Sequence, residues 1–158
     1  GLPGEESEDV QQTIDLLAEA QPGRFRWTFF YPFPGTEAYR LSEEGGYIDY
    51  HKKETLSNFT ESSCLDFGPD QNLFLSKVGR MMPWFVNARA GFEGSDVYRK
   101  KVDELMAMDE AAWQQVEDGL LEEEKKLSEQ MVREGKRHYA VKYNPFMGVI
   151  SDYFLSEE

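Results

Sequence analysis

The sequence has a single cysteine, Cys64, among its 158 residues. One thiol excludes an internal disulfide, a cysteine-rich zinc site and an iron–sulfur cluster held by four thiolates of this chain. Long apolar runs are also missing, since none approaches the roughly 18–20 residues needed to span a bilayer. No segment has the pattern of a signal peptide. We therefore expect a cytoplasmic protein without a membrane partner.

Basic residues are scarce as well. Lysine and arginine together number 17, against 30 aspartates and glutamates, and the formal net charge is −13. A field of that sign repels phosphate backbones, so nucleic acid is not an expected partner.

Motifs for catalysis or metal binding are missing too. Neither of the two histidines, His51 and His138, lies at metal-ligand spacing from another ligand type, and there is no nucleophile elbow or P-loop. We interpret the glutamate runs at residues 43–44 and 122–124 as solvated faces, and Cys64 as a buried or incidental thiol. The sequence therefore predicts no catalytic residue and no metal ligand in this chain.

What the chain does contain is typical of a folded domain, with 40% hydrophobic and 14% aromatic residues. We expect Ser7 to cap a helix over "EDVQQTIDLLAEA" that stops at residues 21–23. Strand formers fill residues 24–31, and "PFPGT" then turns into a second helix that residues 45–46 end. This order of loop, helix, strand and helix predicts α/β architecture with parallel strands.

Residues 24–31 alternate in character. One face carries an aromatic row, which we expect to pack against the covering helices. On the opposite face, we expect Arg26 and Thr28 to point into a barrel or the mouth of a site, because a polar row suits a cavity. The alternative is that Arg26 lies at a sheet edge in solvent. The aromatic row consists of Phe25, Trp27, Phe29 and Tyr31.

The chain after residue 50 is predicted to be mainly helical. Beyond a polar connector, helices are expected to open at Asp70, Ser95 and Asp109, and the last is closed by Gly135. Pro83 is expected either to kink the first of them or to start a second segment. The apolar tail at residues 138–155 is expected to dock onto the fold.

The last of these helices carries an apolar seam of roughly heptad spacing. We interpret the seam as packing against the body of the same protein, and the alternative is a dimer zipper. The seam consists of Trp113, Val116, Leu120, Leu127 and Met131.

Two segments, "GLPGEESEDVQQTIDLL" and "WTFFYPFPGTEAY", lie one β/α unit apart. Together they resemble the radical S-adenosylmethionine (SAM) superfamily. The closest branch is the one that often carries a cobalamin-binding domain, such as the anaerobic magnesium-protoporphyrin ester cyclases and related methyltransferases. The resemblance covers residues 1–48. It implies that residues 1–50 are the last β/α units of a partial TIM-like barrel, followed by a mainly α-helical C-terminal extension at residues 51–158.

The resemblance also implies a site and its cofactors. In the family, a loop after the fifth strand passes the adenine of SAM with backbone contacts, and the end of the sixth strand flanks the nucleoside and the substrate cavity. Thr36 matches the cap of the next helix. The matching loop residues are Gly1, Leu2, Pro3, Gly4 and Glu5, and the matching strand-end residues are Phe30, Tyr31 and Pro32.

This chain departs from the family pattern in one respect. The family's [4Fe–4S] cluster is held by Cys-x-x-x-Cys-x-x-Cys, and here only Cys64 is present. The resemblance therefore implies that the N-terminal barrel half, in the remainder of the same polypeptide, holds the cluster, and that this chain alone is inactive. The expected parent is an enzyme that abstracts hydrogen from a small-molecule substrate, or that transfers a methyl group with cobalamin.

An alternative from a different functional class stays open. The chain could be a stand-alone acidic α/β–helical module without catalysis that works through protein contacts along the seam at residues 113–131.

Overall fold

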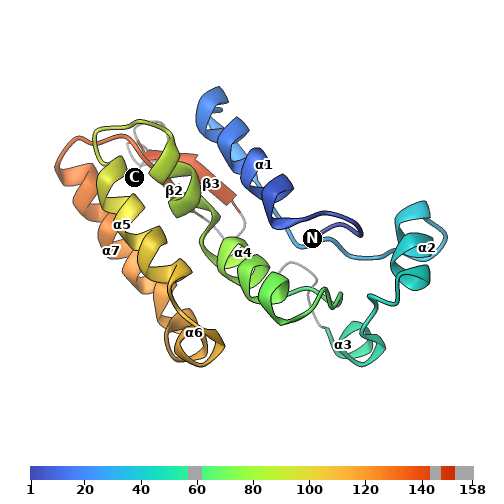
Figure 1. Cartoon of the computed structure of the whole chain (residues 1–158). Helices are drawn as coiled ribbons and strands as arrows, with labels where there is room; N and C mark the ends of the chain where they lie inside the picture. The colour runs from blue at the N-terminus through green and yellow to red at the C-terminus, as the bar shows by residue number, and fades with distance from the viewer. Residues whose placement is uncertain (57–61, 143–146, 152–158) are drawn as a thin grey trace.

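A computed structural model describes residues 1–56, 62–142 and 147–151 (Figure 1). The fold is 61% helical and carries a small three-stranded antiparallel sheet. In chain order the elements are α1 (Ser7–Ala20), β1 (Arg24–Arg26), α2 (Glu37–Glu44), α3 (Tyr50–Thr55), α4 (Pro69–Arg89), α5 (Ser95–Met106), α6 (Glu110–Val116), the 3-10 turn η1 (Glu117–Gly119), α7 (Leu120–Arg133), β2 (Tyr139–Val141) and β3 (Met147–Ile150).

The helix ends follow local chemistry. Thr36 and Asp109 cap α2 and α6 with their side chains, as predicted. The α1 cap is Glu6, one residue before the predicted Ser7, since Glu6 and Asp9 form a reciprocal capping box. The prediction that Asp70 caps α4 is wrong. That helix starts at Pro69, whose fixed φ and missing N–H suit the first helical position.

The described strand pairs are antiparallel, so the prediction of parallel strands is wrong for them. β3 lies between β1 and β2, with Arg24 opposite Val149 and Tyr139 opposite Ile150. The predicted strand at residues 24–31 is also shorter, because its pairing to β3 ends at Arg26. Part of the apolar tail supplies β2 and β3, as the docking prediction requires, and the rest of the tail lies outside the described residues.

The predicted kink of α4 is confirmed. Pro83 has no N–H to donate to the carbonyl of Gly79, four residues earlier, and the backbone of Met81 between them is non-helical (φ −126°, ψ 30°). The indole Nε1 of Trp27 instead donates to the Gly79 carbonyl at 2.8 Å. The kink thus leaves the Gly79 carbonyl without a partner in the helix, and the Trp27 indole donates to it.

Trp27 and Phe29 of the aromatic row pack on α4, in agreement with the prediction that this face meets the helices. Phe25 and Trp27 are buried, whereas Phe29 is half-buried and belongs to the edge of the core. The ring of Phe29 covers Gly79, where a Cβ would overlap it. This close approach explains a glycine in the middle of a helix.

The predicted helix from Asp109 to Gly135 is broken into α6, η1 and α7. The break includes Gly119, a residue that weakens a helix by about 1 kcal/mol. The seam is nevertheless buried in its own chain, since Trp113 is 2% exposed and Met131 is fully buried. These residues therefore offer little of the surface that a dimer zipper or an interaction module would use.

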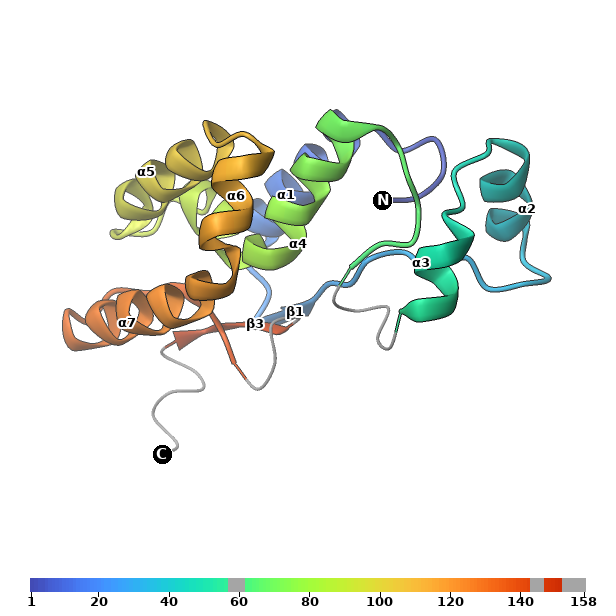
Figure 2. The same cartoon turned by 90° about the horizontal axis from the view of Figure 1, so that it is seen from below.

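Figure 2 shows how the elements are distributed in space. The sheet lies against one side of the helical body formed by α1 and α4–α7. The chain leaves β1 as an extended segment and reaches α2 and α3, which lie apart from the other helices. Among the helices described, none is both long and apolar enough to cross a bilayer.

Replacement of Gly148 by alanine is expected to lower the free energy of unfolding by about 1–3 kcal/mol, as overpacking of a filled core does. A Cβ at Gly148 would lie 2.7 Å from Cζ of Phe25. The Phe25 ring is confined by Tyr139, at 4.9 Å between centroids, and by Trp27, at 5.5 Å. Urea denaturation measures the loss. Gly23→Ala, whose Cβ enters open space, is the control and should change stability by less than about 0.5 kcal/mol; equal effects of the two changes would contradict the expectation.

Candidate functional site

The glycine loop, residues 1–5, folds back on itself. The amide of Glu5 donates to the carbonyl of Leu2 at 3.0 Å, and Gly4 supports the turn with a φ of 84°. The Glu5 carboxylate accepts from the nitrogens of Gly1 and Leu2, the latter at 3.0 Å. Pro3 is half-buried. The amides of Leu2 and Glu5 are therefore already engaged within the loop.

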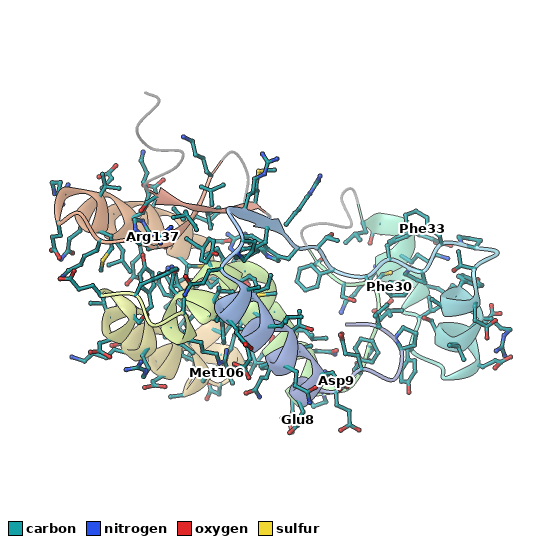
Figure 3. The ribbon with its side chains drawn as sticks, turned by 90° about the horizontal axis from the view of Figure 1, so that it is seen from above. Glu8, Asp9, Phe30, Phe33, Met106 and Arg137 are labelled. Atoms are coloured by element: carbon teal, nitrogen blue, oxygen red, sulfur yellow. The ribbon has the colours of Figure 1, made fainter. Side chains whose placement is uncertain are left out.

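The aromatic segment, residues 27–33, leads from β1 toward α2. Phe30 and Tyr31 are half-buried and Pro32 is buried. The ring of Tyr31 lies 4.9 Å from that of Phe33, which is 52% exposed. Figure 3 shows Phe30 and Phe33 on the side of α2 and α3, away from the sheet.

Arg26 and Thr28 are both exposed. In the described chain they face solvent, which for Arg26 agrees with the alternative weighed from the sequence. Neither residue lines the cavity described next.

The glycine loop and the aromatic segment meet on one face of α4. A Cβ at Gly1 would lie 3.1 Å from the Leu75 side chain, and the Phe29 ring covers Gly79, one helical turn further along. Leu75 and Phe29 both line a cavity of about 200 Å³, here called the α4 pocket. Its polar lining consists of Lys52, Ser62, Ser63, Asn72, Ser76 and Glu110.

The serine hydroxyls that line the α4 pocket can donate hydrogen bonds. The Oγ of Ser63 accepts from the Leu65 amide at 3.0 Å, and the Oγ of Ser76 accepts from the Trp113 indole at 3.1 Å. Within the described ranges neither hydroxyl has an acceptor for its own hydrogen. The ammonium of Lys52 lies 3.9 Å from its nearest carboxylate. The pocket therefore suits a molecule that presents hydrogen-bond acceptors, with Phe29 and Leu75 as apolar walls.

Cys64 is unsuited to metal binding. The residue is 1% exposed, and burial raises the pKa of its thiol, which favours the thiol over the thiolate that binds metals. In the part of the chain that the structure describes, histidine, cysteine and carboxylate side chains form no group of three that could hold a metal ion. These residues do not fit an iron–sulfur cluster.

A buried polar cluster in the helical body escaped the sequence analysis. It consists of Trp84, Tyr98, Glu124, Ser128 and His138, of which Glu124 is 2% exposed. The interpretation of residues 122–124 as a solvated face is therefore wrong for Glu124. The missed signal is its position four residues after Leu120, on the apolar seam.

The histidine of this cluster is held between a backbone carbonyl and a serine hydroxyl. Nδ1 of His138 lies 3.0 Å from the carbonyl of Lys136, which can only accept, so this nitrogen carries the proton. Nε2 forms a hydrogen bond with the Ser128 hydroxyl at 2.8 Å. Serine and histidine at this distance resemble half of a catalytic triad, but both are buried and neither lines the α4 pocket. A substrate therefore has no route to them through that pocket.

The chain matches no protein-family model, no curated protein and no solved structure in comparisons with each. What it does is therefore inferred from its own residues and their geometry.

Proposed function

We propose that this chain is the C-terminal portion of a radical SAM iron–sulfur enzyme and forms one wall of the cavity for SAM and substrate. One observation carries the proposal. The two segments that resemble the family contact α4 at Leu75 and Gly79, one turn apart, and Phe29 of the second segment lines the same pocket as Leu75. Their convergence supports a shared role.

The residues present fit one side of such a cavity rather than a whole site. The α4 pocket, at about 200 Å³, lies below the roughly 300–1,000 Å³ of typical small-molecule sites. In this proposal residues 1–5 and 30–32 border the nucleoside, and the hydroxyls of Ser63 and Ser76 meet acceptor atoms of the bound molecule. The remainder of the polypeptide completes the cavity.

The bound cofactors supply the radical chemistry, either hydrogen abstraction or cobalamin-linked methyl transfer. The described residues of this chain do not fit the [4Fe–4S] cluster, so we assign the cluster to the N-terminal barrel half. The contribution of this chain is to orient the nucleoside and to exclude water.

Formation of 5′-deoxyadenosine tests the proposal. The complete reading frame that encodes this chain is expressed, reconstituted anaerobically with iron and sulfide, and incubated with SAM and a reductant. We expect 5′-deoxyadenosine from protein that contains a [4Fe–4S] cluster. A reading frame without Cys-x-x-x-Cys-x-x-Cys, or no product from cluster-loaded protein, would overturn the proposal.

A matched pair of variants tests the role of the glycine loop. Gly4→Ala and Gly23→Ala both place a Cβ in open space, but only Gly4 has a left-handed backbone. That conformation costs a residue with a side chain about 1–2 kcal/mol, so Gly4→Ala should raise the KM for SAM about 5–30-fold. Gly23→Ala should leave it unchanged. The same KM for both variants would remove the loop from the SAM site.

A further inference from the structure

The two edges of the small sheet differ in what occupies them. β3 is the central strand, and β1 and β2 are the edge strands. In an antiparallel pair, residues that hydrogen-bond the neighbouring strand alternate with residues whose backbone groups face away from it. The backbone bonds to β3 therefore show which residues of each edge strand face outward.

Side chains of the helical body occupy the outward groups of β2. The bonds between β2 and β3 leave Tyr139 and Val141 facing away from β3. Asn87 on α4 bonds both the amide and the carbonyl of Tyr139, and the Glu124 carboxylate on α7 accepts from the Val141 amide at 3.2 Å. A further strand therefore cannot pair with these groups of β2.

The outward groups of β1 have no such partner. The amide of Ile150 donates to the carbonyl of Gly23 at 3.5 Å, so Phe25 is the next residue that faces β3, and Arg26 faces away from it. Within the described ranges, neither the amide nor the carbonyl of Arg26 has a hydrogen-bond partner. The same holds for Thr28, two residues further along, and both residues are exposed.

The guanidinium of Arg26 indicates which strand suits this edge. It forms no ion pair in the part of the chain that the structure describes, although the sequence holds 30 acidic residues. A second copy of the chain fits poorly, because two antiparallel β1 strands centred on Phe25 would place Arg24 opposite Arg26, and like charges in that position are destabilising. An acidic side chain opposite Arg26 is favoured instead.

We propose that the edge of β1 receives a strand of the N-terminal barrel half, whose backbone pairs with Arg26 and Thr28 and which places an acidic side chain opposite Arg26. This inference rests on the proposed function, in which the remainder of the same polypeptide completes the cavity. Residues 30–32 follow Thr28 directly, so the added strand also fixes the aromatic segment beside the nucleoside. The sheet of the complete protein then continues past β1 and ends at the occupied edge of β2, as an open sheet rather than a closed barrel.

Amide hydrogen exchange tests the pairing without any variant. In the 158-residue chain, the amides of Arg26 and Thr28 should exchange as fast as those of an exposed loop. In the complete protein, expressed from the full reading frame, the added strand should slow both on the order of 100-fold or more. The Phe25 amide faces β3 in both proteins and is the control, with protection expected in each. Equal exchange rates of the Arg26 amide in the two proteins would overturn the proposal.

Two substitutions of Arg26 test the bond and the charge. Arg26→Pro removes an amide hydrogen that β3 does not use, so the unfolding constant of the 158-residue chain should change by less than about threefold. In the complete protein it leaves a carbonyl of the added strand unpaired and should raise that constant about 5–150-fold. Arg26→Glu places like charges opposite each other and should raise it about 2–5-fold, again only in the complete protein. For either variant, equal effects in the two proteins would contradict the pairing.

The strand pairing and the proposed function can fail separately. If the complete protein forms 5′-deoxyadenosine while its Arg26 amide exchanges fast, the pairing is wrong and the proposed function stands. If the Arg26 amide is protected but cluster-loaded protein forms no product, the pairing stands and the radical activity is wrong.

Discussion

Replacement of Asn87 by alanine is expected to lower the free energy of unfolding by about 2–6 kcal/mol, because two buried backbone groups lose their partners at about 1–3 kcal/mol each. Asn87 is fully buried on α4. Its Nδ2 donates to the Tyr139 carbonyl at 2.8 Å, and its Oδ1 accepts from the Tyr139 amide at 2.7 Å. One amide side chain thus pairs with β2 as a neighbouring strand would.

Urea denaturation at constant pH measures this loss. Gln114→Ala is the matched control, since it removes an exposed amide whose Nε2 donates to the exposed Glu110 side chain, at 2.8 Å. The control should change stability by less than about 0.5 kcal/mol. A loss below 1 kcal/mol for Asn87→Ala would mean that water or the relaxed strand replaces both bonds.

Replacement of Trp27 by alanine is expected to cost about 3–5 kcal/mol, as truncation of a buried aromatic side chain does. Trp27→Phe separates the two contributions of this side chain. It retains a six-membered aromatic ring and removes the pyrrole part of the indole with its Nε1 donor, which lies 2.8 Å from the Gly79 carbonyl. We expect that variant to lose about 1–3 kcal/mol, the cost of leaving a buried acceptor unpaired.

A double-mutant cycle with Pro83→Ala tests the reason for this bond. Alanine at position 83 supplies the missing backbone N–H, which can satisfy the Gly79 carbonyl within the helix. Trp27→Phe should therefore cost less in the Pro83→Ala background, with a coupling energy of about 0.5–3 kcal/mol. Additive losses would show that the indole stabilises the chain through packing alone.

The features that the sequence predicted correctly depend on residues that lie close together in the sequence. Thr36 and Asp109 cap helices because their side chains reach amides three residues away. The alternation of residues 24–31 predicted that Phe25 and Trp27 are buried and that Arg26 and Thr28 are not, since successive strand residues face opposite sides. The pairing of Arg24 with Val149 has no local signal. The direction of the sheet was therefore wrong, although the strand itself was found.

The sequence likewise indicated some residues of the candidate site and missed others. The resemblance singled out the glycine loop and the aromatic segment, but nothing local indicates that Ser76 and Lys52 share a pocket with Phe29. Glu124 was misassigned because three successive glutamates suggest solvent. Only its partners on α4 and β2 make burial acceptable, and both lie at least 17 residues away in sequence.

The carbonyl that Pro83 frees also decides where the aromatic row can dock. Aromatic side chains recur at every second position from Phe25 to Tyr31, so a slip by two residues would keep the same face toward the helices. Hydrophobic burial alone discriminates poorly between such alignments. Among these rings only that of Trp27 carries an N–H, and Gly79 has an acceptor for it. The missing helix hydrogen bond at Pro83 therefore favours one alignment of residues 25–31 on α4 over alignments shifted by two residues. It also disfavours misfolded states that bury similar apolar side chains.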